Sequence, residues 1–183
     1  MDHPDNVSVD RRRTERVEAT AWDDFFYDAF YGGAIGGSTV ALVGLLIDLA
    51  KFEPLFMPSL IGSALFLGAD PASVTEVRMD MVAYFTAVHI VAFLALGLAM
   101  SAMVQRMHEL ALHPVVVTVV IFLALQVGFV VADRLFLGGV VGVIGFWWIA
   151  LPNALGAAAM GIFLLKAHSD TDTVYVANTN VDA

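Results

Sequence analysis

Residues 84–97, YFTAVHIVAFLALG, place one histidine, His89, in a stretch that is otherwise almost wholly apolar. The apolar run extends over residues 80–104, which is long enough for a helix to cross about 30 Å of hydrocarbon, since this takes roughly 20 residues. Runs of similar character lie at 33–50, 114–137 and 140–166. The sequence therefore predicts four transmembrane helices.

The composition of the whole chain agrees with this prediction. Of the 183 residues, 59% are hydrophobic and 15% are charged, whereas an average soluble domain has about 45–50% apolar residues. We therefore expect an all-α integral membrane protein, built as a bundle of four transmembrane helices and surrounded by membrane lipid.

The polar ends of the chain limit the expected membrane domain to residues 19–168. Residues 1–18 are polar and predicted to be disordered, and residues 169–183 form a second polar tail. Lys and Arg gather on one side of the spans, at Arg11, Arg12, Arg13, Arg16, Arg106 and Lys166, against Lys51, Arg78 and Arg134 on the other. Because positive residues prefer the cytoplasm, we expect both termini to be cytoplasmic, in a prokaryotic inner (plasma) membrane.

Two features of the composition exclude classes of partner and cofactor. The formal net charge is -9, whereas a nucleic-acid-binding protein carries a basic face, so we expect no nucleic-acid partner. The chain has no cysteine, which excludes disulfides, thiolate metal sites and covalent c-type haem. Histidine is left as the strong nitrogen ligand.

An aromatic segment precedes the first span. The sequence TAWDDFFYDAFYGG predicts an amphipathic helix whose apolar stripe consists of Trp22, Phe25, Phe26, Ala29 and Phe30. Such a stripe is typical of an aromatic belt at the membrane interface. The opposite face is acidic, whereas a helix that lies on lipid usually carries a basic one. The alternative is therefore a docking helix for a partner subunit.

The segment between the first two spans is also apolar, but its core, residues 55–68, is too short to span. Stretches of this length lie in the interface, enter the bilayer partway, or pack on a protein core. Pro58 suits the first turn of a short helix and Gly68 suits its end. Asp70 before Pro71 predicts a fresh helix start, with the pair Ser73 and Glu76 as a competing one.

Small residues on the first span predict close helix packing. Gly33, Gly37, Gly44 and Asp48 share one helical stripe, and small residues at such spacing let helices approach closely in lipid. Asp48 is therefore expected to point into protein. Because Asp133 and Arg134 lie at a similar depth, the sequence predicts an ion pair between the first and third spans.

Polar side chains recur near the midplane of every span, at His89, Gln126, Asn153 and Thr39, with Thr86 one turn from His89. One interpretation is that they bind one another and tie the helices together. The other is a polar cavity that binds a ligand, with lipid or a quinone head group as candidate, or that passes protons.

Metal binding has weaker signals. His108, His113 and His168 fall on the same predicted side of the membrane and are candidates for a divalent metal site. Their spacing matches no strong motif, and ordinary interfacial histidines are the alternative.

Two functions follow from these patterns. The chain lacks phosphate-binding, dinucleotide-binding and nucleophile motifs, so the first hypothesis is a non-catalytic accessory or assembly subunit of a larger membrane complex, with energy-transducing complexes among the candidates. Other membrane subunits, or further copies of this chain, are its expected partners. The second hypothesis is a small-molecule or quinone-binding membrane redox protein that uses the polar layer around His89.

Overall fold

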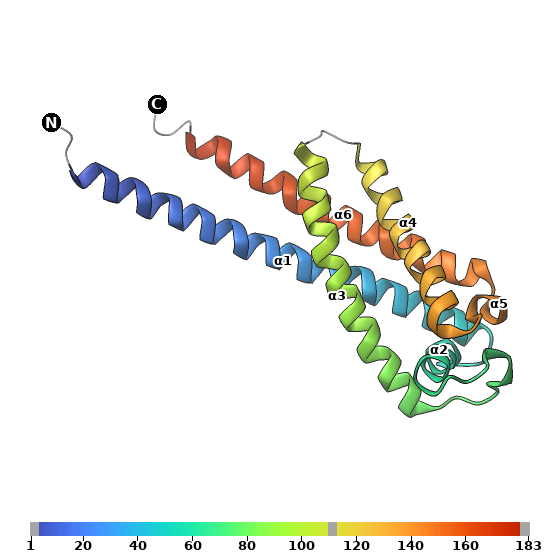
Figure 1. The fold of residues 1–183 in the computed structure, drawn as a ribbon. Helices are drawn as coiled ribbons and strands as arrows, with labels where there is room; N and C mark the ends of the chain where they lie inside the picture. Colours follow the sequence, from blue (N-terminus) through green and yellow to red (C-terminus); the bar gives the residue numbers. More distant parts are fainter. Residues whose placement is uncertain (1–3, 110–112, 180–183) are drawn as a thin grey trace.

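The computed structural model describes residues 4–109 and 113–179 of the chain (Figure 1), and these form helices with no strand. The long helices are α1 (Pro4–Ala50), α3 (Met79–Glu109), α4 (Pro114–Ala132) and α6 (Phe146–Thr179). Shorter elements join them: α2 (Phe56–Leu67), the 3₁₀ turn η1 (Pro71–Ser73), the π-helical turn η2 (Asp133–Leu137) and α5 (Val140–Ile144).

Four helices among the described residues are long and apolar enough to cross a membrane. Their spans are Phe25–Ala50, Met79–Val104, Val115–Leu137 and Phe146–Ala167. The prediction of an all-α, membrane-embedded bundle of four spanning helices is therefore confirmed.

The boundaries of the first and last spans differ from those expected. The aromatic segment is part of α1 and continues into the first span without a break. The fourth span begins at Phe146 and not at residue 140, because Gly145 has φ 92° and separates the short helix α5 from α6. Helices α1 and α6 also extend into the stretches 1–18 and 169–183.

Helices α1 and α6 run side by side, and the start of α1 lies at the same end of the molecule as the end of α6 (Figure 1). Helix α3 crosses α1, and α4 packs on α6. Helix α2 is seen nearly end-on beside them, so it crosses the long helices steeply. The side of the membrane that holds the two ends of the chain remains a prediction.

One face of α1 packs closely against α3. A Cβ atom at Gly33 would overlap the backbone carbonyl oxygen of Phe93, and a Cβ at Gly97 would overlap that of Ala29. A Cβ at Gly37 would lie 2.9 Å from the side chain of Phe93. Gly33 and Gly37 therefore bring two helices close together, as expected in lipid, whereas a Cβ at Gly44 of the same predicted stripe would have no neighbour within 4 Å.

A second face of α1, one residue out of register with the first, packs against α6. A Cβ at Gly36 would lie 2.8 Å from Cε of Met160, and one at Gly32 would lie 2.9 Å from Cδ2 of Leu164. From the other helix, a Cβ at Gly156 would lie 3.1 Å from the carbonyl oxygen of Gly36. The glycine pairs at 32–33 and 36–37 thus serve two neighbouring helices at once.

Helix α2 packs on a protein core. Its buried residues are Met57, Ser59, Leu60, Ile61, Gly62, Ser63 and Ala64, and its neighbours include α1, α3, α5 and η2. As predicted, the helix ends at Gly68, whose φ is 61°, and Asp70 begins a new turn at Pro71 by accepting a hydrogen bond from the N–H of Ala72. The long helix α3 begins only at Met79.

Gly33→Ala should destabilise the bundle by about 1–3 kcal/mol, because the added methyl group meets a backbone carbonyl that cannot turn away. Gly44→Ala on the same helix is the matched control, since a Cβ there has no neighbour within 4 Å. Unfolding in detergent micelles, followed by circular dichroism, measures the free energy of both variants. Equal stability of the two would contradict the close approach of α1 and α3.

Candidate functional site

A cavity of 720 Å³ lies between the long helices and is closed at one end by α2. Helix α3 packs on α1 and α4 on α6, whereas α3 and α4 make few contacts with each other. The walls therefore diverge and leave a cleft. Its lining is mostly apolar, with polar side chains at Asp48, Thr86, His89 and Asn153.

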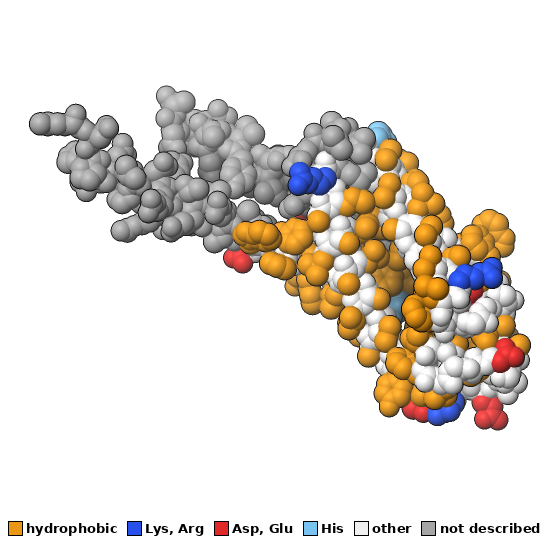
Figure 2. Space-filling view, viewed as in Figure 1, with side chains coloured by type: hydrophobic (Ala, Val, Ile, Leu, Met, Phe, Trp, Pro, Cys, Tyr) orange, Lys and Arg blue, Asp and Glu red, His pale blue; other side chains and the backbone are white. Residues whose placement is uncertain are grey.

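The cleft opens between α3 and α4, where the space-filling view shows a hollow in the surface (Figure 2). The outer faces of these two helices are apolar and exposed, with Val88, Leu123 and Val127 among the exposed side chains. Hydrocarbon is the natural solvent of such a surface. The opening therefore faces the membrane interior and not water.

His89 is held by a backbone group of α1. Its Nε2 lies 3.0 Å from the carbonyl oxygen of Gly37. A carbonyl oxygen can only accept, so Nε2 carries the proton and donates it. The ring is flanked by Phe85 and Phe93, with ring centroids at 5.7 and 4.6 Å. Glycine at position 37 lets α3 come close enough for this bond.

A second polar pair joins the third and fourth spans. Nδ2 of Asn153 donates to Oε1 of Gln126 over 2.9 Å, and both side chains are buried. Asn153 also lines the cleft, together with its neighbour Pro152 inside α6. The expected midplane layer is thus partly assembled, with His89 and Asn153 on one cavity and Gln126 behind it.

The two threonines do not bond across helices. Oγ1 of Thr39 donates to the carbonyl of Ile35, and Oγ1 of Thr86 donates to that of Val82, each over 2.7 Å within its own helix. Of the two, only Thr86 lines the cleft. A single layer that joins all four spans through side chains is therefore not formed within the described residues.

The predicted ion pair of Asp48 or Asp133 with Arg134 is not among the salt bridges of the described residues, and both acids bind backbone N–H groups instead. Oδ2 of Asp48 accepts a bond of 2.9 Å from the N–H of Met57 in the first turn of α2. Oδ1 of Asp133 accepts one of 3.3 Å from Val141 in the first turn of α5. Arg134 is exposed, and none of the salt bridges found among the described residues involves it.

These two carboxylates replace missing helix caps. The N-cap residues of α2 and α5 are Leu55 and Gly139, which have left-handed backbones and provide no side-chain cap. A carboxylate at a helix N-terminus satisfies a free N–H and favours the helix dipole. Asp48 and Asp133, both at most 3% exposed, therefore anchor the short helices at the closed end of the cleft.

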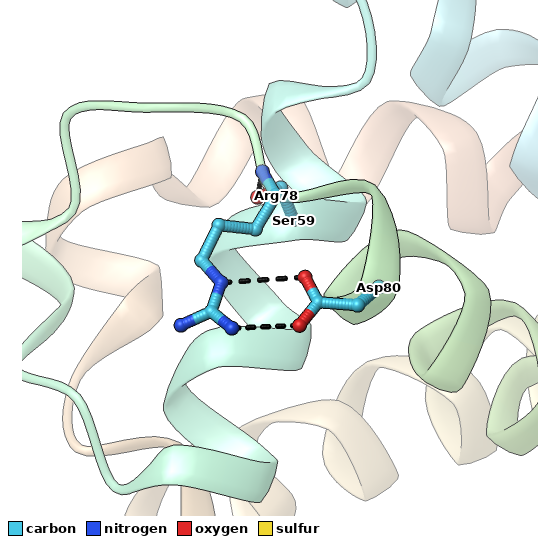
Figure 3. A network of polar contacts seen from close by, with 3 residues as sticks. All are labelled: Ser59, Arg78 and Asp80. Atoms are coloured by element: carbon cyan, nitrogen blue, oxygen red, sulfur yellow. Dashed lines mark hydrogen bonds and ion pairs between the residues drawn. The ribbon is translucent and has the colours of Figure 1, made fainter.

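The start of α3 is fixed at the same end of the molecule. The buried hydroxyl of Ser59 on α2 accepts a hydrogen bond of 2.8 Å from the backbone N–H of Arg78 (Figure 3). The guanidinium of Arg78 in turn pairs with Asp80, Nη2 to Oδ2 over 2.6 Å, at the surface. Helix α2 thus connects the ends of α1 and α3.

The metal prediction has no support from the described residues, which hold no group of three or more potential ligands. His113 caps α4, where its Nδ1 accepts a hydrogen bond from the N–H of Val115 over 3.2 Å. The side chains of His108 and His168 lie outside the described residues.

The aromatic stripe divides into two parts. Ala29 is buried against α3 and Phe25 is half-buried, whereas Trp22, Phe26 and Phe30 are more than half exposed. Trp22, Phe25 and Phe26 form a ring cluster with centroids 5.5–6.3 Å apart. The exposed part leaves a continuous aromatic surface on α1.

Comparison of the chain with protein-family models, with curated proteins and with solved structures gives no match. The function is therefore argued from the site itself.

Asp48→Ala should destabilise the fold by about 1–2 kcal/mol, because it removes the cap of α2 and leaves the N–H of Met57 buried without an acceptor. Asp48→Asn is the matched control, since its amide oxygen can still accept and its loss should be smaller. Thermal unfolding in micelles compares the two. If both variants lose the same stability, the charge of Asp48 matters and not the hydrogen bond.

Proposed function

We propose that this chain binds a lipid-soluble small molecule with a polar head group in the cleft between α3 and α4. The observation that carries the proposal is the cavity itself, which is apolar along most of its wall and has His89 and Asn153 on it. Ligand sites typically have volumes of about 300–1,000 Å³ and pair an apolar lining with a few placed polar groups. The cavity of 720 Å³ meets both conditions.

The route of access also supports a membrane-borne ligand. Because the opening lies between two exposed apolar helices, a ligand dissolved in lipid can enter sideways without crossing water. The head group would then lie beside His89, and its hydrocarbon tail would follow the apolar wall towards the opening. Quinones and other long-chain amphiphiles have this form.

Gly128→Leu should abolish binding by filling the cleft. Gly128 lines it, and a Cβ there meets no atom within 4 Å, so a larger side chain can enter the space without disturbing the helix. Gly142→Leu is the control, since position 142 is equally open but does not line the cleft. Native mass spectrometry of the protein in lipid nanodiscs, titrated with 4-dodecylphenol and with its methyl ether, counts the bound molecules.

We expect both compounds to bind to the wild type and to the Gly142 variant. Their affinity for the Gly128 variant should be at least tenfold lower, because filling the site removes most of the binding energy (about 1.4 kcal/mol per tenfold). Equal uptake of both compounds by all three proteins would mean simple partitioning into lipid and would refute the proposal.

The exposed aromatic surface of α1 favours a second candidate, the accessory or assembly subunit. Trp22, Phe26 and Phe30 are each 55% exposed or more, and exposed aromatic groups are typical of the central contacts of protein interfaces. A subunit that binds a lipid-soluble molecule for a larger complex would combine both functions.

Replacing Trp22 and Phe26 by alanine should release any partner subunit while the chain stays folded, because both side chains are exposed and their loss opens no cavity. Trp147→Ala is the matched control, since this residue is 77% exposed but lies at the start of α6, at the end of the bundle away from Trp22. Gentle extraction followed by native mass spectrometry compares the complexes. Unchanged assembly in the double variant would remove the docking role.

A further inference from the structure

We infer that the cleft selects a head group that donates a hydrogen bond, a hydroxyl of the phenol or quinol type, over one that only accepts, such as an ether or a quinone carbonyl. The inference rests on the proposed binding function and specifies its ligand. It follows from which polar atoms of the cleft wall are already used by the protein.

Most hydrogen-bond donors of the polar side chains on the cleft wall already bind acceptors of the protein. The one proton of a neutral His89 ring is donated from Nε2 to the carbonyl of Gly37, which leaves Nδ1 as a lone-pair acceptor. The hydroxyl proton of Thr86 is donated to the carbonyl of Val82, so its oxygen is also left to accept. Neither Nδ1 of His89 nor Oδ1 of the Asn153 side-chain amide has a partner among the described residues.

Proline at position 152 adds a further acceptor. Pro152 lies inside α6 and lines the cleft. It has no N–H, so it cannot donate to the carbonyl of Trp148, one turn earlier, as any other residue in an α-helix would. That carbonyl therefore lacks its usual helical donor, on a residue that also lines the cleft.

Two donors remain on the wall, and neither offsets this excess. One N–H of Asn153 is donated to Gln126, and the second is left beside the carbonyl oxygen of the same amide. The indole N–H of Trp148 belongs to a ring that stacks under the Lys51 ammonium, 4.7 Å from its centroid, where α1 ends. The His89 ring itself offers a ligand only the lone pair of Nδ1.

A hydroxyl head group fits this inventory. It donates its proton to Nδ1 of His89 and can still accept from Asn153. An ether or carbonyl of the same shape would place its lone pair against that of Nδ1. The cleft therefore recognises long-chain phenols or quinols by a bond that the methylated or oxidised forms do not make.

The test compares 4-dodecylphenol with its methyl ether, which share a tail and differ by the donated proton. In nanodiscs, the wild type should bind the phenol about 3- to 10-fold more tightly, as one membrane hydrogen bond allows. Binding to the Gly128→Leu variant is subtracted as partitioning. In His89→Leu, which removes the acceptor, the ratio of phenol affinity to ether affinity should fall to about one.

The possible results distinguish the preference for a donating head group from the proposed binding function. Equal specific binding of phenol and ether to the wild type overturns the inference and leaves the proposed function standing, whereas no specific binding of either overturns both. A preference for the phenol that persists in His89→Leu would place the acceptor elsewhere, and this result also overturns the inference.

A second measurement tests the protonation of the His89 ring in the wild type and does not depend on whether a variant folds. Nitrogen NMR of the ¹⁵N-histidine-labelled wild type should assign His89 to the tautomer protonated at Nε2, and addition of the phenol should shift the Nδ1 signal. A ring protonated at Nδ1 alone contradicts the inference.

Discussion

The close contact of the α1 backbone with two other helices is the constraint on which the rest of the structure depends. Because its glycines at 33 and 37 contact α3 while those at 32 and 36 contact α6, α1 fixes the positions of both helices. Helix α4 then packs on α6 and lies away from α3. The cleft is what remains between α3 and α4, which pack on different helices and make few contacts with each other. Its presence follows from backbone packing on α1.

Buried acids at the closed end have a role that charge alone does not suggest. A carboxylate in an apolar region is unfavourable unless its oxygens are satisfied, and here the partners are backbone N–H groups of the first turns of α2 and α5. The same bonds satisfy helix ends whose own N-cap residues, Leu55 and Gly139, cannot do so. One hydrogen bond therefore satisfies both a buried carboxylate oxygen and a buried backbone N–H. These bonds hold α2 and α5 in place at the closed end of the cleft.

Sequence patterns predict the spans well because hydropathy and length decide them, and they predict the packing stripe at Gly33 because small residues four apart lie on one face. They miss the second stripe at Gly36, since adjacent stripes overlap and only the structure assigns each to a neighbour. They also predict depth but not rotation about the helix axis. Gln126 and Asn153 meet as their shared depth suggests, whereas His89 finds a backbone carbonyl, which leaves no signature in a side-chain pattern.

The acceptor-rich wall has a general cause in the membrane. An unsatisfied N–H or O–H in hydrocarbon costs several kcal/mol, so the hydroxyl of Thr86 and the imidazole of His89 donate to helix carbonyls, which are abundant and can each accept twice. Lone pairs are then left over, because donors are the scarcer partner once every backbone N–H is used within its helix. The presence of Pro152 on the wall, where one more N–H is missing, increases the imbalance at the place where a ligand would lie. A membrane cleft built in this way favours ligands that bring their own proton.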